Sequence, residues 1–474
     1  MTGSASGNGT VARLTASPVP ERGGRSERGF SLSDLRNLVK AGQIDTVLLA
    51  VPDLQGRLKG KRYDADHFLR RIAHSGAEVC AYVLATDVDM SPAAGFALTS
   101  WETGYQDLAI SPALSTLRQL PWMPRTAFML GDAVHHDGTP LDIAPRQILQ
   151  DQMTRLARHG LHAKAGLETE FVLYQGTYAQ VEEAGYRVLC PLTTRNLDYA
   201  LDHDPVSDRF FRRLQRALAG AGLPVEAIKT EAGPGQVEVT FPYGGALTAC
   251  DGHLLFKHAV RTLGARAHLA PTFMAAPETG RANGLHLHVS LWSKGISQLN
   301  EPGGGLSEIA RHAIAGLLDG LPDLGPLYAP NVNSYKRFIP GSFAPTAFSW
   351  GYDNRTCAVR VVGHGDGLHL EIRVPGADAN PYLALAAVLA AIDHGIEQRL
   401  ALGPAVTGNA YSVDGTPVPS TLGQALAAFQ ASAFTERAFG GDVVQHYARL
   451  AQLELDHHQR LVTDAERQRW LERA

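Results

Sequence analysis

Polar and apolar residues alternate in four segments of this sequence, and this alternation most constrains how the chain can fold. The segments are AGLETEFVLY from Ala165, GQVEVTFPY from Gly235, GLHLHVSLW from Gly284 and LHLEIRVP from Leu368. Successive side chains of a β-strand point to opposite faces, so each segment predicts a strand with one polar and one apolar face. Longer stretches with helical spacing separate these strands. We therefore expect an α+β fold whose largely antiparallel sheet is covered by helices on one face.

The 474 residues are too many for one compact core, so two domains are expected. SLSDLRNLVKA from Ser31 predicts a helix, and IDTVLLAVPD, VCAYVLATDVDM, YQDLAISPAL and TAFMLGDAV predict short strands. From about Ile143 the apolar residues recur at helical spacing. We predict a flexible tail at residues 1–29, a small N-terminal domain at 30–140 and a large domain at 141–474.

Composition excludes several classes of protein. The net charge of -4 and the absence of a Lys/Arg block argue against a nucleic-acid partner. Four scattered cysteines argue against a disulfide framework or a cysteine-based zinc site. The longest apolar stretch, Tyr382 to Ile392, is far shorter than the ~20 residues of a membrane helix. We expect a soluble cytoplasmic protein that binds no membrane.

Carboxylates recur in pairs that suit a cation. Glu168 and Glu170 lie two residues apart and share one strand face, where like charges resist joint ionisation unless a cation lies between them. Glu231 and Glu238 bracket a Gly-Pro-Gly turn that allows them to converge. A solvent-facing strand edge and an ordinary turn explain either pair taken alone.

Histidines and arginines extend this set. His286 and His288 share a strand face, although a core position explains either one by itself. Glu371 and Arg373 share another face, and the arginines upstream include Arg337, Arg355 and Arg360. Arginine suits carboxylates and phosphates. Oxygen-rich ligation with little nitrogen and no sulfur favours Mg²⁺ or Mn²⁺ over zinc.

Six segments resemble the successive signature blocks of type I glutamine synthetases, in the family's order. They are GLETEFVLY, EAGPGQVEVTF, GLHLHVSL, NSYKRFIPG, DNRTCAVRV and EIRVPGADANPYLALAAVLAAIDHGI. The resemblance implies a small β-grasp-like N-terminal domain and a large catalytic domain with a curved antiparallel sheet flanked by helices. It also implies an enzyme that phosphorylates the γ-carboxylate of L-glutamate with ATP and transfers the γ-glutamyl group to an amine.

The same resemblance implies two divalent ions and a set of site residues. One ion is expected on Glu170, Glu231 and Glu238, and the other on Glu168, His286 and Glu371. The expected nucleotide contacts are Glu226, His288, Ser290, Arg355 and Arg360, and the expected glutamate contacts are Ala282, Arg337, Arg355 and Arg373. Of these, Arg337, Arg355 and Arg360 are the expected catalytic residues.

The chain departs from ammonia-using members of the family in the flap after the YKR block. Phe343 stands where those members carry a glutamate, and the aspartate of an N-terminal loop is missing unless Asp87 or Asp89 replaces it. Losing anionic groups removes ligands for a small cation, and an apolar wall suits a carbon chain. This pattern resembles the glutamate-amine ligases that use polyamines, ethanolamine or alkylamines. Arg281-Ala282 also replaces the Asn-Gly of the usual glutamate-binding loop.

Three functions remain open. The first is a glutamate-amine ligase, the second a glutamine synthetase that uses ammonia, and the third a non-catalytic nucleotide-binding regulator. Tyr411 lies near the tyrosine that some members adenylylate, although a surface tyrosine in a polar loop explains it as well. The resemblance also implies a dodecamer of two stacked hexameric rings. In that assembly Asp87 or Asp89 and the loop from Trp101 to Tyr105 line a site across a subunit boundary.

Overall fold

The computed structural model describes residues 31–474 of the chain. The tail predicted for residues 1–29 therefore lies outside the described residues. Across residues 31–474 no helix is both long and apolar enough to span a membrane. The apolar stretch noted in the sequence instead forms most of the buried helix α10 (Pro381–Glu397), which is part of the core.

The N-terminal part of the chain forms a six-stranded mixed sheet. Helix α1 (Leu32–Lys40) precedes it, and a capping box between Ser31 and Asp34 fixes the first turn of this helix. The strand order is β2-β1-β6-β4-β3, with β5 paired to β6 and only β1 and β6 parallel. The strands are β1 (Thr46–Pro52), β2 (Leu58–Asp64), β3 (Ala77–Cys80), β4 (Asp107–Pro112), β5 (Arg118–Gln119) and β6 (Thr126–Val134). The β-grasp assignment of this part stays a prediction.

The strand predicted for VCAYVLATDVDM is mostly wrong. Only Ala77–Cys80 pairs, and the chain then turns into a 3-10 helix at Ala81–Leu84. The partner strand β4 begins at Asp107, opposite Cys80, so the residues after Cys80 have no strand beside them. A backbone without a ladder partner satisfies its polar groups locally.

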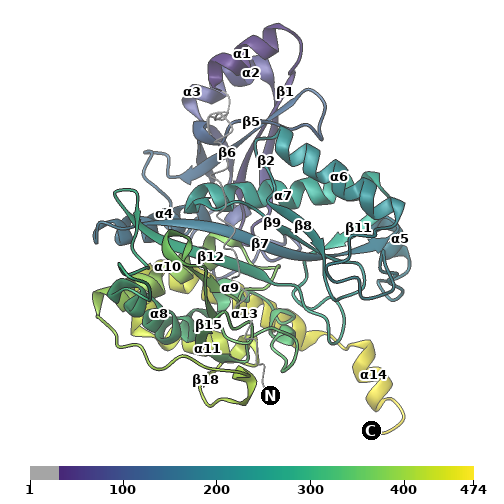
Figure 1. Ribbon diagram of the computed structural model, residues 1–474. Coiled ribbons are helices and arrows are strands. Elements are labelled where there is room, and N and C mark those ends of the chain that lie inside the picture. Colours follow the sequence, from purple (N-terminus) through teal and green to yellow (C-terminus); the bar gives the residue numbers. More distant parts are fainter. Residues whose placement is uncertain (1–30) are drawn as a thin grey trace, which may run out of the picture.

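A second, ten-stranded sheet occupies the middle of the molecule and confirms the predicted antiparallel arrangement (Figure 1). Its order is β15-β16-β17-β12-β7-β9-β8, with β10 and β11 paired to β7 and β13 paired to β12, and only β15 and β16 are parallel. The strands are β7 (His162–Gln175), β8 (Ala227–Thr230), β9 (Gln236–Thr240), β10 (Gly244–Gly245), β11 (Leu269–Thr272), β12 (Leu285–Ser293), β13 (Ile296–Ser297), β15 (Trp350–Tyr352), β16 (Val359–Val362) and β17 (His369–Ile372). The long strand β7 is the spine of this sheet.

Helices pack against the apolar face of this sheet and around each other. The helical pattern predicted from about Ile143 begins with α4 (Pro145–Ala157), and α7 (Ala246–Arg266) is one of the helices that separate the strands. Helix α10 crosses α8 (Glu308–Gly320) closely at Gly316 and Gly395. A Cβ on Gly395 would lie 2.1 Å from the His312 carbonyl oxygen, so this crossing requires glycine. The remaining elements are α2 (Ala65–His67), α3 (Ala73–Ser75), α5 (Tyr178–Glu183), α6 (Pro205–Gly220), α9 (Gly325–Tyr328), β14 (Ala347–Phe348), β18 (Thr416–Pro417), α11 (Leu422–Ala431), α12 (Ala433–Phe439), α13 (Gly441–Arg460) and α14 (Asp464–Trp470).

The predicted boundary near residue 140 falls between β6 and α4. The hydrophobic core is not divided there, since one continuous buried cluster joins Leu35 and Val47 of the N-terminal part to Leu287 and Tyr382. The N-terminal sheet stands above β7 in Figure 1 and packs onto the larger part of the chain. The division into domains at 30–140 and 141–474 stays a prediction.

Candidate active site

Strand β7 carries the two carboxylates around which the site forms. Glu168 and Glu170 point to one face, while Thr169 between them is fully buried on the other face, where its hydroxyl lies 3.2 Å from His253. The neighbouring strands are in register with these carboxylates: His286 of β12 lies opposite Glu168, and Glu238 of β9 lies opposite Glu170. The alternation within each strand and the register of three neighbouring strands therefore place these carboxylates and His286 close together.

The first cluster consists of Glu170, Glu231 and Glu238, whose carboxylate oxygens lie within 4.8 Å of one another. Glu231 directly follows β8 and begins the turn to β9, where its backbone N–H donates to the Gln236 carbonyl at 3.0 Å. Gly235 has a positive φ of 70° in this turn, which favours glycine. The predicted convergence of Glu231 and Glu238 is confirmed, and we call this group the three-carboxylate cluster.

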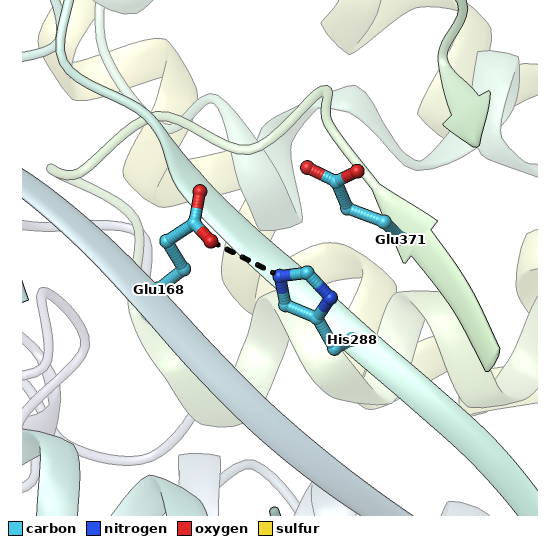
Figure 2. Close-up of side chains that lie close together, drawn as sticks. All are labelled: Glu168, His288 and Glu371. Atoms are coloured by element: carbon cyan, nitrogen blue, oxygen red, sulfur yellow. Dashed lines mark ion pairs between the residues drawn. The ribbon is translucent and has the colours of Figure 1, made fainter. Parts of the chain in front are cut away.

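The second cluster consists of Glu168, His288 and Glu371, with ligand atoms again within 4.8 Å of one another (Figure 2). His286 lies at the same place, because its Nδ1 is 2.7 Å from Glu168 and 3.5 Å from Glu371. The His288 Nε2 is 3.4 Å from Glu168. The geometry thus offers two imidazoles where the sequence indicated only His286 as a ligand.

The electrostatics of these clusters suit a divalent cation. Burial, together with the Glu168 and Glu231 carboxylates, raises the pKa of Glu238 well above its usual range. Burial also opposes ionisation of Glu371, but the charges of Arg373 and His286 outweigh it and lower its pKa to about 2. The His288 Nε2 is buried, and among the described residues its one ion-pair partner is the Glu168 carboxylate, with which it makes no hydrogen bond. Crowded carboxylate oxygens with imidazole nitrogens beside them fit Mg²⁺ or Mn²⁺.

Three of the four predicted arginines adjoin the second cluster. Arg373 forms a buried ion pair with Glu371, and Arg360 lies 2.8 Å from the same carboxylate. Arg337 is buried and donates to the carbonyl oxygens of Arg373 at 3.0 Å and Val374 at 3.1 Å. The Nε atoms of Arg337 and Arg373 are buried and lack partners in the described part of the chain, so both guanidinium groups keep free donors.

The fourth predicted arginine lies apart from the others. Arg355 is exposed in the turn after β15, and within residues 31–474 its guanidinium makes no ion pair or hydrogen bond. The structure therefore does not bring it into contact with the second cluster. Its predicted part in binding glutamate and ATP stays a prediction.

A cavity of about 340 Å³ lies beside the second cluster and brings three of the five predicted nucleotide residues together, without Arg355 and Arg360. Glu226, His288 and Ser290 line it, with Glu168 also in its wall. Phe241, Tyr243 and Trp292 add an aromatic surface that the sequence did not single out. Because such surfaces stack on planar bases, the cavity can hold a nucleotide base next to a charged cluster.

The residues predicted for the amine pocket lie in two places. Phe343 is 60% exposed, with a positive φ of 59°, and Arg373 approaches its carbonyl oxygen at 3.5 Å. Asp87 and Asp89 instead line a separate cavity of about 570 Å³ that also includes Lys257, and Phe343 does not line this cavity. Within one chain these residues do not form a single pocket, and their meeting across a subunit boundary stays a prediction.

Tyr411 is half-buried and not merely a surface tyrosine of a polar loop. Its hydroxyl donates to the Ala344 carbonyl at 3.0 Å, directly after Phe343. Burial raises the pKa of this hydroxyl. The side chain therefore ties its own loop to the flap.

Two residues that the sequence did not single out support the three-carboxylate cluster. The Gln236 amide donates to Glu170 at 3.1 Å and to the Ala282 carbonyl at 2.7 Å, which joins the cluster to the predicted glutamate-binding loop. Lys229 forms an ion pair with Glu231. The signal for Lys229 was its place two residues before Glu231, which gives both side chains the same strand face.

Known proteins share both the sequence and the fold. The family described as "Glutamine synthetase, catalytic domain" matches residues 142–470. The chain is 46% identical over 444 residues to the γ-glutamylethanolamide synthetase GlnA4 of Streptomyces coelicolor, which covers 94% of this chain and 96% of that protein. It is 32% identical over 446 residues to a glutamate–isopropylamine ligase of a Pseudomonas species, with 92% and 97% covered.

A solved structure gives the same result at the level of the fold. A GmaS/ADP complex superposes with a TM-score of 0.80 at 29% identity, covering 93% of this chain and 99% of that one. The family match extends over most of the chain and includes both clusters and the arginines around them. The chain belongs to the glutamine synthetase family.

Proposed function

We propose that this protein joins L-glutamate to a substituted amine, with ATP as the co-substrate, to form a γ-glutamyl amide. As a member of its family it is an ATP-dependent ligase that forms a carbon–nitrogen bond between glutamate and an amine. The observation that carries the proposal is the gathering of two carboxylate-rich clusters on one face of β7. An aromatic cavity lies beside them, as do two arginine Nε donors that have no partner within residues 31–474.

In this proposal the two clusters hold two divalent ions. Glu170, Glu231 and Glu238 hold one, and Glu168 and Glu371 hold the other with an imidazole from His286 or His288. When bound, such ions neutralise phosphate charge and polarise the transferred phosphoryl group. The other nucleotide contacts fall to Glu226, Ser290 and the aromatic wall of the cavity.

The arginines orient the substrates and stabilise charge. Arg337 and Arg373, together with the loop at Ala282, hold the glutamate, because their free donors suit its carboxylate. Arg360 and Arg355 face the phosphoryl group, where guanidinium donors stabilise the charge of the transition state. Catalysis then depends on positioning and electrostatics more than on covalent chemistry by the protein.

The reaction balances in two steps. An oxygen of the glutamate γ-carboxylate attacks the γ-phosphorus of ATP, and the bond to ADP breaks, which leaves a γ-glutamyl phosphate. The amine nitrogen then attacks the carbonyl carbon of this acyl phosphate, phosphate leaves with the electrons of the C–O bond, and the nitrogen releases one proton. The product is a γ-glutamyl amide.

A substituted amine is preferred over ammonia for two reasons. Phe343 places an exposed apolar ring on the flap, next to the carbonyl that Arg373 approaches. Relatives of the chain include ligases named for ethanolamine, isopropylamine and, in Escherichia coli, putrescine. Glutamine synthesis from ammonia is the second candidate. A non-catalytic regulator is disfavoured because all six predicted metal ligands are present at the site.

The proposal includes an oligomeric assembly and a cellular location. We expect a dodecamer of two hexameric rings in the cytoplasm, with Asp87 or Asp89 of one subunit near the flap of its neighbour. Trp101, which is 74% exposed in this chain, belongs to the loop expected at that boundary. Full activity in a stable monomer would contradict this arrangement.

The test is ATP-dependent phosphate release with glutamate and one amine at a time. Ammonium, ethanolamine, putrescine, spermidine and isopropylamine form the panel, and Phe343→Glu is assayed beside the wild type. We expect turnover with at least one substituted amine and little with ammonium. Phe343→Glu should raise the ratio of ammonium to substituted-amine turnover about tenfold, since it exchanges an apolar wall for a cation ligand. Strong wild-type turnover with ammonium alone would reject the preference for substituted amines.

A further inference from the structure

The ammonium group of Lys229 lies inside a small cation-binding box. Its walls are Glu231, with which it pairs directly, Asp198 at 3.6 Å, Glu238 at 3.9 Å and the ring of Tyr199, whose centroid is 4.3 Å away. Three carboxylates and the face of an aromatic ring are the groups with which proteins bind ammonium ions. We call this group the Lys229 box.

The fold builds this box rather than leaving it to flexible side chains. Strands β8 and β9 pair so that Lys229 lies directly opposite Glu238. Thr230, which is buried, fixes the other wall: its hydroxyl donates to the Leu197 carbonyl at 2.5 Å, and its carbonyl accepts the Tyr199 N–H at 3.2 Å. These two bonds hold the loop that carries Asp198 and Tyr199 over the lysine.

The box shares two carboxylates with the three-carboxylate cluster, so it adjoins the proposed reaction site. Glu231 and Glu238 contact Lys229 on one side and lie within 4.8 Å of Glu170 on the other. A small cation that entered the box would therefore stand next to the place where the γ-carboxylate is activated. The side chain of Lys229 already places an ammonium group there.

We propose that Lys229 excludes the ammonium ion from this box and so restricts the nucleophile to substituted amines. This inference rests on the proposed function. Ammonium has no carbon atoms, so all its binding must come from charge and hydrogen bonds, and Lys229 occupies the groups that would supply them. A substituted amine keeps a second source of binding, because its carbon chain can contact an apolar surface such as Phe343.

Removing the lysine should therefore admit ammonium to the reaction. The chemistry is unchanged: ammonia forms the new bond at the carbonyl carbon of the γ-glutamyl phosphate, phosphate leaves, and a proton is released to give glutamine. Lys229 acts as a specificity residue in this scheme and takes no proton in the reaction.

The experiment compares Lys229→Ser, which empties the box, with Lys229→Arg, which keeps a cation in it. Lys40→Ser, at an exposed position of α1, is the matched control. Each protein is assayed for phosphate release with ammonium and with the amine panel. Metal-free samples are also melted in ammonium chloride and in sodium chloride of equal concentration, which reports binding to the box without catalysis.

We expect Lys229→Ser to gain at least about tenfold in the ratio of ammonium to substituted-amine turnover, and to melt higher in the ammonium salt. Wild type, Lys229→Arg and Lys40→Ser should show neither effect. If Lys229→Ser is folded but gains neither ammonium turnover nor ammonium binding, the proposal is wrong. Loss of turnover with every amine in folded Lys229→Ser would also overturn it, because the lysine would then be needed for the reaction itself.

The two proposals can fail separately. Ammonium binding to Lys229→Ser in a protein that turns over no amine would support the box and reject the ligase function. Substituted-amine turnover by the wild type without any change in Lys229→Ser would support the ligase and reject the box.

Discussion

Substituting Gly284 by alanine tests whether the packing of the site positions its catalytic groups. Gly284 precedes β12, and its backbone holds Glu170 in both directions: its N–H donates to the carboxylate at 2.7 Å, and its carbonyl accepts the Glu170 N–H at 3.0 Å. A Cβ at this position would lie 2.6 Å from the His286 Nε2 and 2.9 Å from the Arg337 Nη2. Both side chains would have to move by roughly 0.5–1 Å to reach normal contact distances.

That displacement affects a predicted metal ligand and a predicted substrate contact at once. A misplacement of about 1 Å can cost about 100-fold in rate, or roughly 2.7 kcal/mol of transition-state stabilisation. We expect Gly284→Ala to lose about that much kcat/KM in the phosphate-release assay, whereas overpacking should lower the folding free energy by only about 1–3 kcal/mol. Gly403→Ala is the control, because nothing lies within 4 Å of its Cβ position. Folded Gly284→Ala with wild-type activity would refute the reasoning.

Three further predictions each concern one side chain: Glu238, His446 and Tyr411. Glu238→Gln should weaken Mn²⁺ binding at least about tenfold by calorimetry without lowering the metal-free melting temperature, since it also relieves repulsion among crowded carboxylates; unchanged affinity would exclude Glu238 as a ligand. Burial lowers the pKa of His446 to about 4, below its ordinary 6.5, so between these pH values the unfolded chain binds a proton that the folded one does not. The free energy of unfolding is therefore highest above pH 6.5 and falls by on the order of 3 kcal/mol as the pH drops toward 4. Urea unfolding at several pH values should show this slope in the wild type and a smaller one in His446→Gln; equal slopes would contradict it. Tyr411→Phe removes the donor to the Ala344 carbonyl and should raise the KM for the amine about threefold to tenfold with little change for ATP. The exposed Tyr352→Phe is its control, and an equal effect in both would point to a non-specific cause.

Residue spacing predicted the faces of the site but not how its parts come together. The period of two correctly put Glu168 and Glu170 on one face of their strand, and His286 and His288 on one face of theirs. Nothing in the spacing of one strand says which other strand lies beside it, however. The pairing of β7 with β9 and β12 joins residues far apart along the chain, and only the family resemblance indicated it.

The parts that the sequence missed depend on tertiary contacts. In the sequence Lys229 is an ordinary charged residue of a short strand. Its surroundings become clear only in the structure, where Thr230 holds the loop that carries Asp198 and Tyr199 over it. In the sequence Gln236 is likewise only a polar residue after a turn. In the structure its amide donates to both Glu170 and Ala282. The period of two indicates only that Lys229 shares a face with Glu231. The contacts with Asp198, Tyr199 and Ala282 follow no period or motif, so the sequence pattern could not have revealed them.

Strand register orders the charges of the site into two rows across the sheet. In one row Lys229 of β8 lies opposite Glu238 of β9, which lies opposite Glu170 of β7. In the other row Arg360 of β16 lies opposite Glu371 of β17, which lies opposite His288 of β12. Each row thus begins with a cation, on β8 or β16, and has a carboxylate on the next strand inward. Because register fixes both rows, the charges are held by backbone pairing rather than by mobile loops.

The net charge of the site affects which amine can bind there. The carboxylates are Glu168, Glu170, Glu231, Glu238 and Glu371, and the paired cations are Lys229, Arg360 and Arg373. The carboxylates exceed these cations, which favours divalent ions, and two such ions would leave the site positive toward a polyphosphate. A positive site repels a free ammonium ion, whereas a substituted amine can offset that repulsion by apolar contact. Lys229→Ser lowers the charge by one, which is the direction that would admit ammonium.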